Sequence, residues 1–374
     1  RSGYVCEVRN SDNMRTVFFI QKSPALAGSQ KSLLRLMCTL GRQAWRPVLI
    51  SGSEGWLTEE SRAAGIPVIV CPFPSARSLY ARLAGNGVCA RRVAKACQPY
   101  GVSGSLVHGN DHIQSLFSLA VAKVLGVPSV LTLRTPGMSR RDFLKYRCRD
   151  HQRIVAVGSD LHKKVCGWCS DPLPDLIENG VDEQEINPCT PVSAVFPPSV
   201  VVPGSTEPRK GWRDLVDALV FLEEKGQGAG VEFALLGNDY GQNVLETVGA
   251  DRLKKIRLKY LPLTADFKKC VSSFLFAVHP SRSESFGMAL LEILAAGVPV
   301  LTARTGVAGQ VIQDERFLFQ PQNPKDLAAK LESLIADFSG ADRMVTYAQN
   351  TIRKQYCVSR TVAQYIKLYS ETGR

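Results

Sequence analysis

HPSRSESFGMALLEILAAGVPVLT, residues 279–302, is the stretch that decides the fold of this chain. The run FLFAVHPS (274–281) predicts a buried strand, GMALLEILAAG (287–297) a helix and PVLTAR (299–304) a second buried strand. A strand, a helix and another strand in immediate succession are typical of a parallel sheet that is covered by helices. Because ligands of such sheets bind beyond the carboxyl ends of the strands, the loop at 280–285 is the first candidate for a site.

The same alternation of short β-branched strands and amphipathic helices runs along most of the 374 residues. It stops in the stretch 170–199, which is rich in Pro, Asn and Asp and has little periodicity, as linkers have. A chain of this length is also typical of two domains. We therefore predict an α/β protein with two Rossmann-like parallel-sheet domains, at 14–185 and 196–350, followed by a terminal helical segment at 351–374. The first 13 residues precede the first predicted strand and are left out of this assignment.

The composition excludes several classes of protein. Hydrophobic residues make up 45% of the chain and charged residues 21%, as in ordinary soluble proteins, and no segment approaches 18 uninterrupted apolar residues. The 11 cysteines are scattered and odd in number, which favours reduced thiols in a cytosolic protein. The pair Cys166 and Cys169 lacks the further ligands that a zinc site needs and follows a predicted helix, so we interpret it as accidental or structural.

The charge is basic and unevenly distributed. The formal net charge is +12, and residues 1–190 carry 24 Lys and Arg against 15 Asp and Glu. Such an excess suits an anionic partner such as a phosphorylated lipid or an acidic membrane surface, although solubility alone explains it equally well. There is no aromatic RNA-binding pattern and no Cys-His finger, so no nucleic-acid partner is expected.

Two glutamates bracket the predicted helix start. Glu292 lies eight residues after Glu284, about 80° round the helix axis and roughly 12 Å along it. Free N–H groups at a helix start bind phosphate, and Gly287 lets a ligand approach the backbone closely. A ligand lying along the helix would contact both carboxylates with its phosphates between them. The alternative is an ordinary helix-start residue at Glu284 and a solvated one at Glu292, although a carboxylate inside so apolar a helix needs a partner.

The quoted stretch closely resembles the signature of the retaining glycosyltransferases of family 4, which have the GT-B fold. The matching features are two glutamates separated by seven residues and the following Ala-Gly-Val-Pro-Val. The resemblance implies two Rossmann-like domains that face a central cleft, with a C-terminal helix that crosses back to the N-terminal domain. It implies that Glu284 lies beside the donor sugar as a catalytic residue and that Glu292 binds the ribose of the nucleotide. The amides implied to meet the donor diphosphate are those of Phe286, Gly287, Met288 and Ala289.

Further matches to this family extend over nearly the whole chain. LVHGND (106–111) is similar to a strand end that lines the cleft, which makes His108 a second catalytic candidate, with a structural histidine as the alternative. PRKGWRDLVDAL (208–219) is similar to the opening of the second domain, where Lys210 is implied to contact the donor phosphates. The family's usual arginine is missing shortly before it, and Arg209 is a candidate substitute.

The first domain departs from the family pattern in two places. LAGSQ (26–30) resembles a donor-binding loop, with Gly28 kept but alanine and glutamine in place of the usual first glycine and glutamate. Arg134 follows the predicted strand SVLTL, where many members of the family have a histidine that faces the donor sugar. A cation there suits a phosphate or an acidic acceptor, so the family's sugar specificity does not transfer to this chain.

Together these matches predict a retaining hexosyl- or glycosyltransferase that moves a sugar from a nucleotide-diphosphate sugar to an acceptor in cell-surface polysaccharide or lipopolysaccharide assembly. The chain has no Asp-x-Asp motif, so no metal and no further cofactor are expected. The expected partners are the donor, a glycan or lipid-linked acceptor and an anionic membrane, with the protein in the cytoplasm at the inner face of the cytoplasmic membrane. Two alternatives stay open: an epimerase or phosphorylase on the same fold, and a non-catalytic nucleotide-sugar-binding protein.

Overall fold

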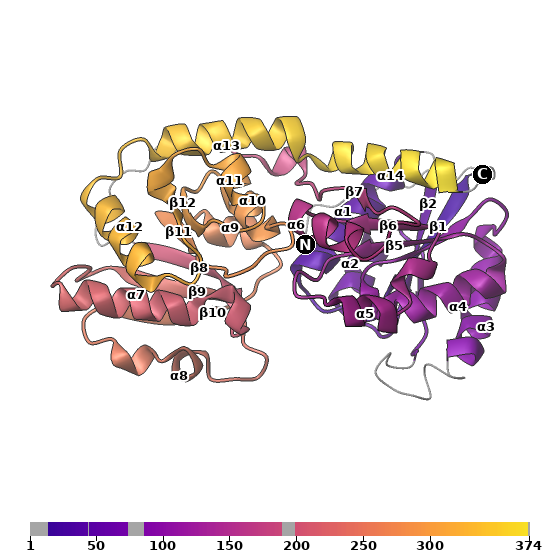
Figure 1. The fold of residues 1–374 in the computed structure, drawn as a ribbon, viewed down its shortest axis with the longest axis horizontal. Helices are drawn as coiled ribbons and strands as arrows, with labels where there is room; N and C mark the ends of the chain where they lie inside the picture. Colours follow the sequence, from indigo (N-terminus) through magenta and orange to yellow (C-terminus); the bar gives the residue numbers. More distant parts are fainter. Residues whose placement is uncertain (1–13, 44, 74–85, 189–198, 373–374) are drawn as a thin grey trace. The chain divides into compact units, whose positions relative to one another are not determined.

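The chain forms two compact α/β units, shown in a computed structural model that describes residues 14–43, 45–73, 86–188 and 199–372. Unit 1 contains the residues up to Gly180 together with those from Val358 onward, and unit 2 contains Val181–Cys357. Figure 1 labels the elements of both units. The division between the units is thus made at two points of the chain, because the last helix is part of unit 1.

Unit 1 is built on a parallel sheet of seven strands in the order β3-β2-β1-β4-β5-β6-β7. The strands are β1 (Arg15–Gln21), β2 (Trp45–Ser51), β3 (Val68–Val70), β4 (Leu106–Gly109), β5 (Ser129–Leu133), β6 (Arg153–Ala156) and β7 (Asp175–Leu176). The α-helices are α1 (Gly28–Leu40), α2 (Trp56–Ala63), α3 (Asn86–Cys97), α4 (Ser115–Leu125), α5 (Arg140–Lys145), α6 (Ser159–Cys166) and α14 (Val358–Thr372).

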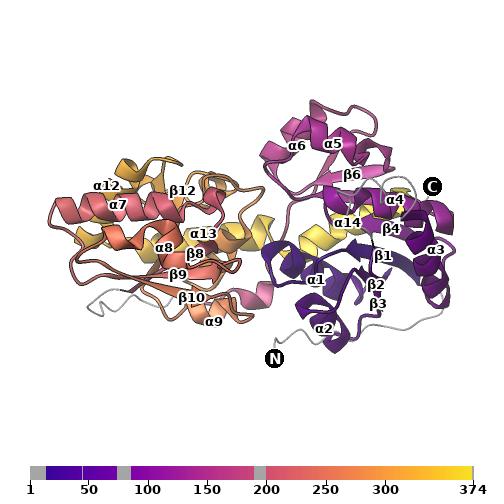
Figure 2. The same ribbon diagram turned by 90° about the horizontal axis from the view of Figure 1, so that it is seen from below.

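Both faces of this sheet are buried. Successive residues of a strand point to opposite faces, so Val17 and Phe19 of β1 pack in the cluster that includes α1 and α14. Phe18 and Ile20 pack in the cluster that includes α3 and α4. The continuous apolar run of β1 is therefore explained by helices on both sides of it. Figure 2 shows the same layers from below, with α4 and α14 near the central strands.

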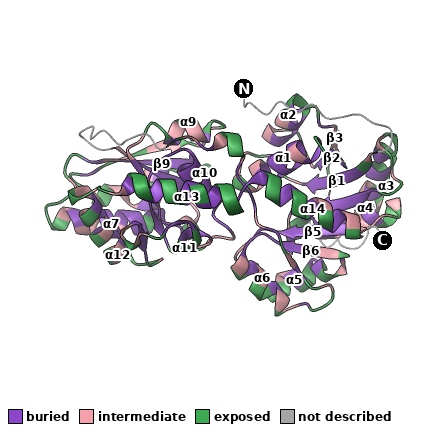
Figure 3. Ribbon diagram, turned by 90° about the horizontal axis from the view of Figure 1, so that it is seen from above, coloured by how far each residue is buried: buried purple, intermediate pink, exposed green. Residues whose placement is uncertain are grey.

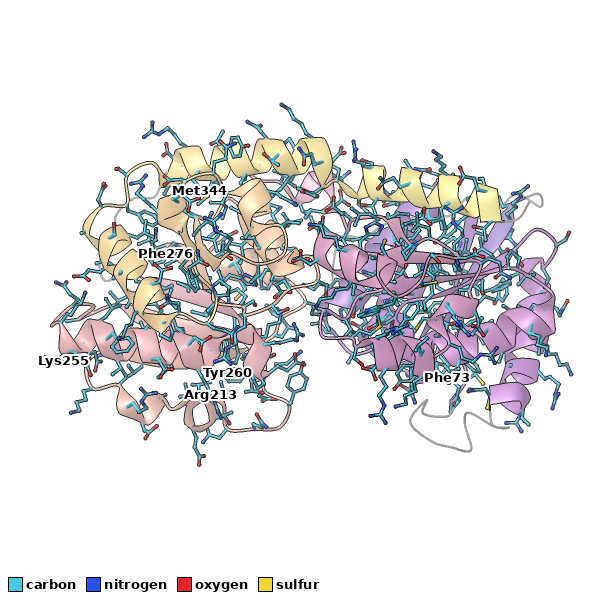
Figure 4. The ribbon with its side chains drawn as sticks, in the orientation of Figure 1. Phe73, Arg213, Lys255, Tyr260, Phe276 and Met344 are labelled. Atoms are coloured by element: carbon cyan, nitrogen blue, oxygen red, sulfur yellow. The ribbon has the colours of Figure 1, made fainter. Side chains whose placement is uncertain are left out.

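Unit 2 repeats this plan with a parallel sheet of six strands in the order β10-β9-β8-β11-β12-β13. The strands are β8 (Ser199–Ser205), β9 (Glu232–Asn238), β10 (Arg257–Pro262), β11 (Phe276–His279), β12 (Val300–Ala303) and β13 (Leu318–Phe319). The α-helices are α7 (Trp212–Glu224), α8 (Val244–Val248), α9 (Phe267–Val271), α10 (Met288–Ala295), α11 (Ala308–Val311), α12 (Pro324–Ala336) and α13 (Ala341–Gln355). In Figure 3 the central strands of both sheets are mostly coloured as buried, whereas the edge strands β3 and β10 are not and α13 and α14 expose one side. Figure 4 labels Phe276 of β11 and Met344 of α13, which are both buried in unit 2.

The stretch quoted above folds as β11, a loop, α10 and β12, as the pattern predicted. The two parallel sheets and the alternation of strands and helices confirm the prediction of two Rossmann-like halves. The predicted terminal segment at 351–374 differs from the structure, because residue 351 lies inside α13, which packs in unit 2. The chain passes to unit 1 only after Cys357, and α14 then buries Val362, Tyr365 and Tyr369 in the core of that unit.

None of the helices in the described parts of the chain has the length and apolar composition that a membrane crossing requires.

Candidate active site

Glu284 lies in the loop between β11 and α10, close to two nitrogen-containing side chains. The Nζ atom of Lys210 is 2.6 Å from its Oε1 atom, and Nε2 of His279 is 3.5 Å from the same oxygen. The Glu284 side chain is only 11% exposed and that of Lys210 18%. Burial by itself raises the pKa of Glu284, but the Lys210 ammonium and His279 outweigh it and hold this pKa well below its ordinary value. Glu284 is therefore a carboxylate at neutral pH.

His279, at the end of β11, contacts two hydroxyl groups besides Glu284. Its Nδ1 atom is 3.2 Å from the Thr302 hydroxyl oxygen on β12, and Nε2 is 3.3 Å from the Ser281 hydroxyl oxygen. Its side chain is buried. This residue was not among those predicted from the sequence, although a histidine at the end of a buried strand directly before the candidate loop is a recognisable signal. The structure makes it a positioning residue for Glu284.

Lys210 is held opposite Glu284 by a close contact between two loops. Gly211 has φ +72°, and a Cβ atom there would lie 1.9 Å from the carbonyl oxygen of Pro280. The backbone N–H of Arg282 donates to the carbonyl of Arg209 at 2.8 Å. The Arg282 guanidinium also donates two hydrogen bonds to Asp214 of α7, at 2.7 and 2.5 Å. The loops after β8 and β11 are thus joined by backbone and side-chain bonds on either side of the Lys210–Glu284 pair.

The start of α10 leaves its first amides without a side-chain cap. Gly287 is the N-cap residue, has φ +108° and carries no side chain that could accept from the helix. The Phe286 side chain is buried, and its carbonyl accepts from the N–H of Val307 at 2.9 Å. The amides at the helix start, Met288 and Ala289 among them, are therefore available to an anionic ligand, and the helix dipole favours negative charge there.

Glu292 lies one turn further along α10, among buried apolar residues. Leu290, Leu291 and Ile293 are almost fully buried, whereas Glu292 is half-buried. The geometry expected from the sequence, with Glu284 before the helix and Glu292 within it, is therefore present in unit 2. The nucleotide-binding role of Glu292 stays a prediction.

Arg209 makes a local ion pair. Its Nε atom is 2.7 Å from a carboxylate oxygen of Glu207, and both side chains are substantially exposed. The predicted contact of Arg209 with the donor would require this ion pair with Glu207 to break. Gly28, the other glycine assigned to the donor, opens α1 of unit 1, and a Cβ atom there would meet no atom within 4 Å.

The catalytic role expected for His108 is not supported by its surroundings. The imidazole is completely buried on β4, its Nδ1 atom lies 2.6 Å from the Tyr369 hydroxyl, and its Nε2 atom lies 2.7 Å from the Thr132 hydroxyl. Burial, with the nearby Arg134 and His151, lowers its pKa well below the ordinary value, so the ring is neutral. Both nitrogens are used and the ring is closed off by α14, as in the structural alternative. The catalytic role of His108 therefore stays a prediction, and these contacts favour the structural alternative.

Arg134 follows β5 and is also buried, but its guanidinium belongs to a polar group at the carboxyl edge of the sheet. Nε donates to Asn110 Oδ1 and Nη1 to Asn179 Oδ1, both at 2.8 Å. The backbone N–H of Arg134 donates to Asp111 at 3.2 Å. Asn110 in turn donates to Gln21 at the end of β1. The ends of three strands thus meet around a fixed cation, and this group of amides was not predicted from the sequence.

Neither the cysteine pair nor other side chains form a metal site within the described residues. Cys166 and Cys169 are free thiols, with Cys166 Sγ 3.5 Å from His162 Nε2 and Cys169 Sγ 3.3 Å from the Asp171 carbonyl. Among the residues that the structure describes, no three His, Cys, Asp or Glu side chains gather as metal ligands.

Comparisons with known proteins agree with the geometry of unit 2. Residues 194–351, which contain Lys210, Glu284 and Glu292, match the family model of glycosyl transferases group 1. The chain is 28% identical over 267 residues to an uncharacterised glycosyltransferase of Methanocaldococcus jannaschii, with 66% of this chain and 69% of that protein covered. It is 26% identical over 298 residues to the D-inositol 3-phosphate glycosyltransferase of Paenarthrobacter aurescens, with 71% and 72% covered.

A solved structure is similar to this chain over nearly its whole length. HepE of Anabaena, in complex with UDP and glucose, has a TM-score of 0.78 with this chain at 19% identity, and the match covers 96% of this chain and 100% of HepE. The fold is therefore that of the GT-B proteins. The resemblance to group 1 glycosyl transferases is confirmed, and the family match lies in unit 2.

Proposed function

We propose that this protein is a glycosyltransferase that moves a sugar from a nucleotide-diphosphate sugar to an acceptor, with retention at the anomeric carbon. The observation that carries the proposal is the Lys210–Glu284 pair beside the uncapped start of α10. A cation, a carboxylate and free helix amides at one sheet edge suit a ligand with both a diphosphate and a sugar. The family match over residues 194–351 and the nucleotide-sugar complexes of HepE support the same class of donor.

The proposed chemistry places negative charge on the leaving diphosphate and positive charge on the anomeric carbon. Lys210 and the amides of residues 286–289 would stabilise the diphosphate, as preorganised donors do in other enzymes. Glu284, held as a carboxylate, would orient the sugar hydroxyls and balance the positive carbon. Lys210 exchanges part of its contact with Glu284 for the phosphates when the donor binds. This arrangement supplies cations and amides for the leaving group, so we propose transfer that requires no metal and no additional cofactor.

Glu292 is proposed to accept hydrogen bonds from the ribose hydroxyls of the nucleotide. It lies on the same helix as the amides proposed to bind the diphosphate, about one turn further along. Gly28 and Arg209 are kept as donor contacts in this proposal. Arg134 is proposed to bind an anionic group of the donor or the acceptor, because Asn110 and Asn179 fix its guanidinium at the carboxyl edge of the sheet of unit 1.

The acceptor is proposed to be a glycan or a lipid-linked glycan, in cell-surface polysaccharide or lipopolysaccharide assembly at the cytoplasmic face of a membrane. The basic composition of residues 1–190 supports an anionic setting of this kind. Release of free sugar without an acceptor, or a requirement for inorganic phosphate, would instead identify a different nucleotide-sugar enzyme.

A thermal-shift screen with UDP-, GDP-, ADP- and dTDP-sugars tests the donor assignment. We expect one nucleotide series to raise the melting temperature of the wild-type protein and Glu292→Ala to abolish this shift, because the ribose contact is lost. Glu224→Ala is the matched control, since Glu224 is an exposed glutamate on α7 of the same unit. A shift that persists in Glu292→Ala would contradict the ribose assignment, and no shift with any of the four series would contradict the proposed donor class.

A further inference from the structure

Three segments of unit 1 carry much of the positive charge of the chain. Residues 86–97, 115–127 and 139–150 contain nine lysines and arginines but two aspartates, so they supply seven of the twelve net positive charges. All nine basic side chains are on exposed residues. They are Arg91, Arg92, Lys95, Lys123, Arg140, Arg141, Lys145, Arg147 and Arg149. These three segments therefore hold more than half of the net positive charge of the chain.

The two aspartates are already engaged. Asp142 accepts from the Ser139 hydroxyl at 2.6 Å in the cap of α5, and Asp150 accepts from Arg147 Nε at 2.6 Å. Both carboxylates thus have partners within residues 139–150. In Figures 1 and 2, α4 lies between α3 and α5, so the charged segments are neighbours in the fold.

The three segments meet at a groove of about 540 Å³. Apolar side chains from α4 and the turn after it line the groove, among them Leu116, Leu119 and Val127. Lys123, Lys145 and Arg147 line the same groove, together with Asp150, which pairs with Arg147. A second hollow, lined by Arg141 and by Lys145 as well, adjoins it through this shared lysine. Cations and apolar groups thus share one hollowed surface, which we call the basic groove.

Large apolar side chains are exposed on the same helices. Val88 on α3, Val124 on α4 and Leu144 on α5 are each 44% exposed. Exposed apolar groups among lysines and arginines are typical of surfaces that lie in the interface of an anionic bilayer, where cations meet lipid phosphates and apolar groups enter the acyl boundary. A polyanion such as RNA would use the cations but would leave the valines and the leucine exposed to water.

We propose that the basic groove and the exposed apolar side chains around it form a docking surface for a bilayer that contains anionic phospholipids. The positive charge favours an anionic partner, and the exposed apolar side chains favour a bilayer over a soluble polyanion. The inference rests on the proposed function in one respect: docking would bring unit 1 to a lipid-linked acceptor. Vesicle binding itself requires no nucleotide sugar. Vesicle binding therefore tests the docking surface, and the nucleotide-sugar thermal shift tests the proposed function, each independently of the other.

Sedimentation of the full chain with vesicles of phosphatidylcholine, with and without phosphatidylglycerol, tests the docking surface. We expect binding only to the anionic vesicles and a steep loss of binding with added salt. Lys123→Glu/Lys145→Glu should weaken binding tenfold or more, because each cation near such a surface contributes to binding and each reversal adds repulsion. Lys354→Glu/Lys367→Glu is the matched control, with the same charge change on exposed positions of α13 and α14.

A second variant separates a membrane from a soluble polyanion. Val124→Ser/Leu144→Ser keeps every charge and should weaken vesicle binding severalfold while leaving the nucleotide-sugar thermal shift unchanged. Equal binding to neutral and anionic vesicles, or undiminished binding of Lys123→Glu/Lys145→Glu, would overturn the proposal. Undiminished binding of the Val124 and Leu144 variant, with displacement of the vesicles by RNA, would assign the surface to nucleic acid instead.

Discussion

Glu284 illustrates at the scale of a residue how neighbours decide the state of a group. Burial alone would favour its protonated form, but Lys210 at 2.6 Å and His279 at 3.5 Å favour the carboxylate. The sequence pattern predicts that Glu284 precedes a helix, and the family resemblance implies that Lys210 contacts the same donor. Their direct contact follows from the approach of two loops that are 74 positions apart in the chain.

Glu284→Gln is expected to lower the free energy of unfolding at pH 7 by about 1–3 kcal/mol, because a charged hydrogen bond to Lys210 is lost in a covered site. The pKa of Glu284 is lower in the folded protein than in the unfolded chain. Its contribution is therefore present above the unfolded value of 4.5 and is lost as the pH falls toward the lower folded value. The difference between the variant and the wild type should thus shrink below pH 4.5.

Urea unfolding of both proteins at pH 7 and at pH 3 checks this expectation. Glu224→Gln, on an exposed part of α7, is the control and should have little effect at either pH. An equal difference between Glu284→Gln and the wild type at both pH values would mean that the ion pair is not its cause.

At the scale of elements, the site depends on the contact between the loops after β8 and β11. Gly211→Ala is expected to destabilise unit 2 by roughly 2–4 kcal/mol, because its Cβ atom would lie 1.9 Å from the Pro280 carbonyl oxygen in a backbone conformation with φ +72°. Relief of this clash separates Lys210 from Glu284, so donor binding should weaken as well.

Chemical denaturation followed by hydrogen exchange in unit 2, together with the donor thermal shift, measures both effects. Gly309→Ala is the control, since the atom nearest to its Cβ position is the end of the flexible Arg304 side chain, at 3.6 Å. If Gly211→Ala were as stable as Gly309→Ala, the loop contact would not be what holds the pair together.

The terminal helix shows why an element can be predicted while its partner is not. The apolar residues Val358, Val362, Tyr365 and Tyr369 recur at helical spacing, so a helix is expected from the sequence alone. That Tyr369 would supply the hydrogen bond to His108, 261 positions away, is decided by packing. This contact favours the structural alternative for His108.

At the scale of the whole molecule, each unit has its own sheet, and the stability of the two units is expected to respond differently to acid. Burial lowers the pKa of His108 well below its ordinary value and that of His151 to about 3. Both histidines lie in unit 1 and must bind protons when that unit unfolds. Their contribution is present above the unfolded value of 6.5 and is lost as the pH falls toward their folded values.

Unit 1 is therefore expected to lose about 2 kcal/mol of stability per histidine between pH 7 and pH 5, a range above that in which Glu284 titrates. Hydrogen exchange at the two pH values resolves the units separately. His151→Gln should reduce this loss by about half, since it removes one of the two groups. The same loss in His151→Gln and in the wild type would contradict the assignment.

The sequence by itself determined the two-fold repetition of parallel α/β units, the position of the loop with Glu284 and the helix with Glu292, because each rests on periodicity and spacing within a short stretch. Tertiary structure alone decided that His279, Asp214 and Arg282 support this loop, that Arg134 is held by Asn110 and Asn179, and that His108 is closed off by α14. These contacts join residues from different strands and helices. Their distances are set by how the sheet edges and helices pack, and local spacing in the sequence carries no information about that packing.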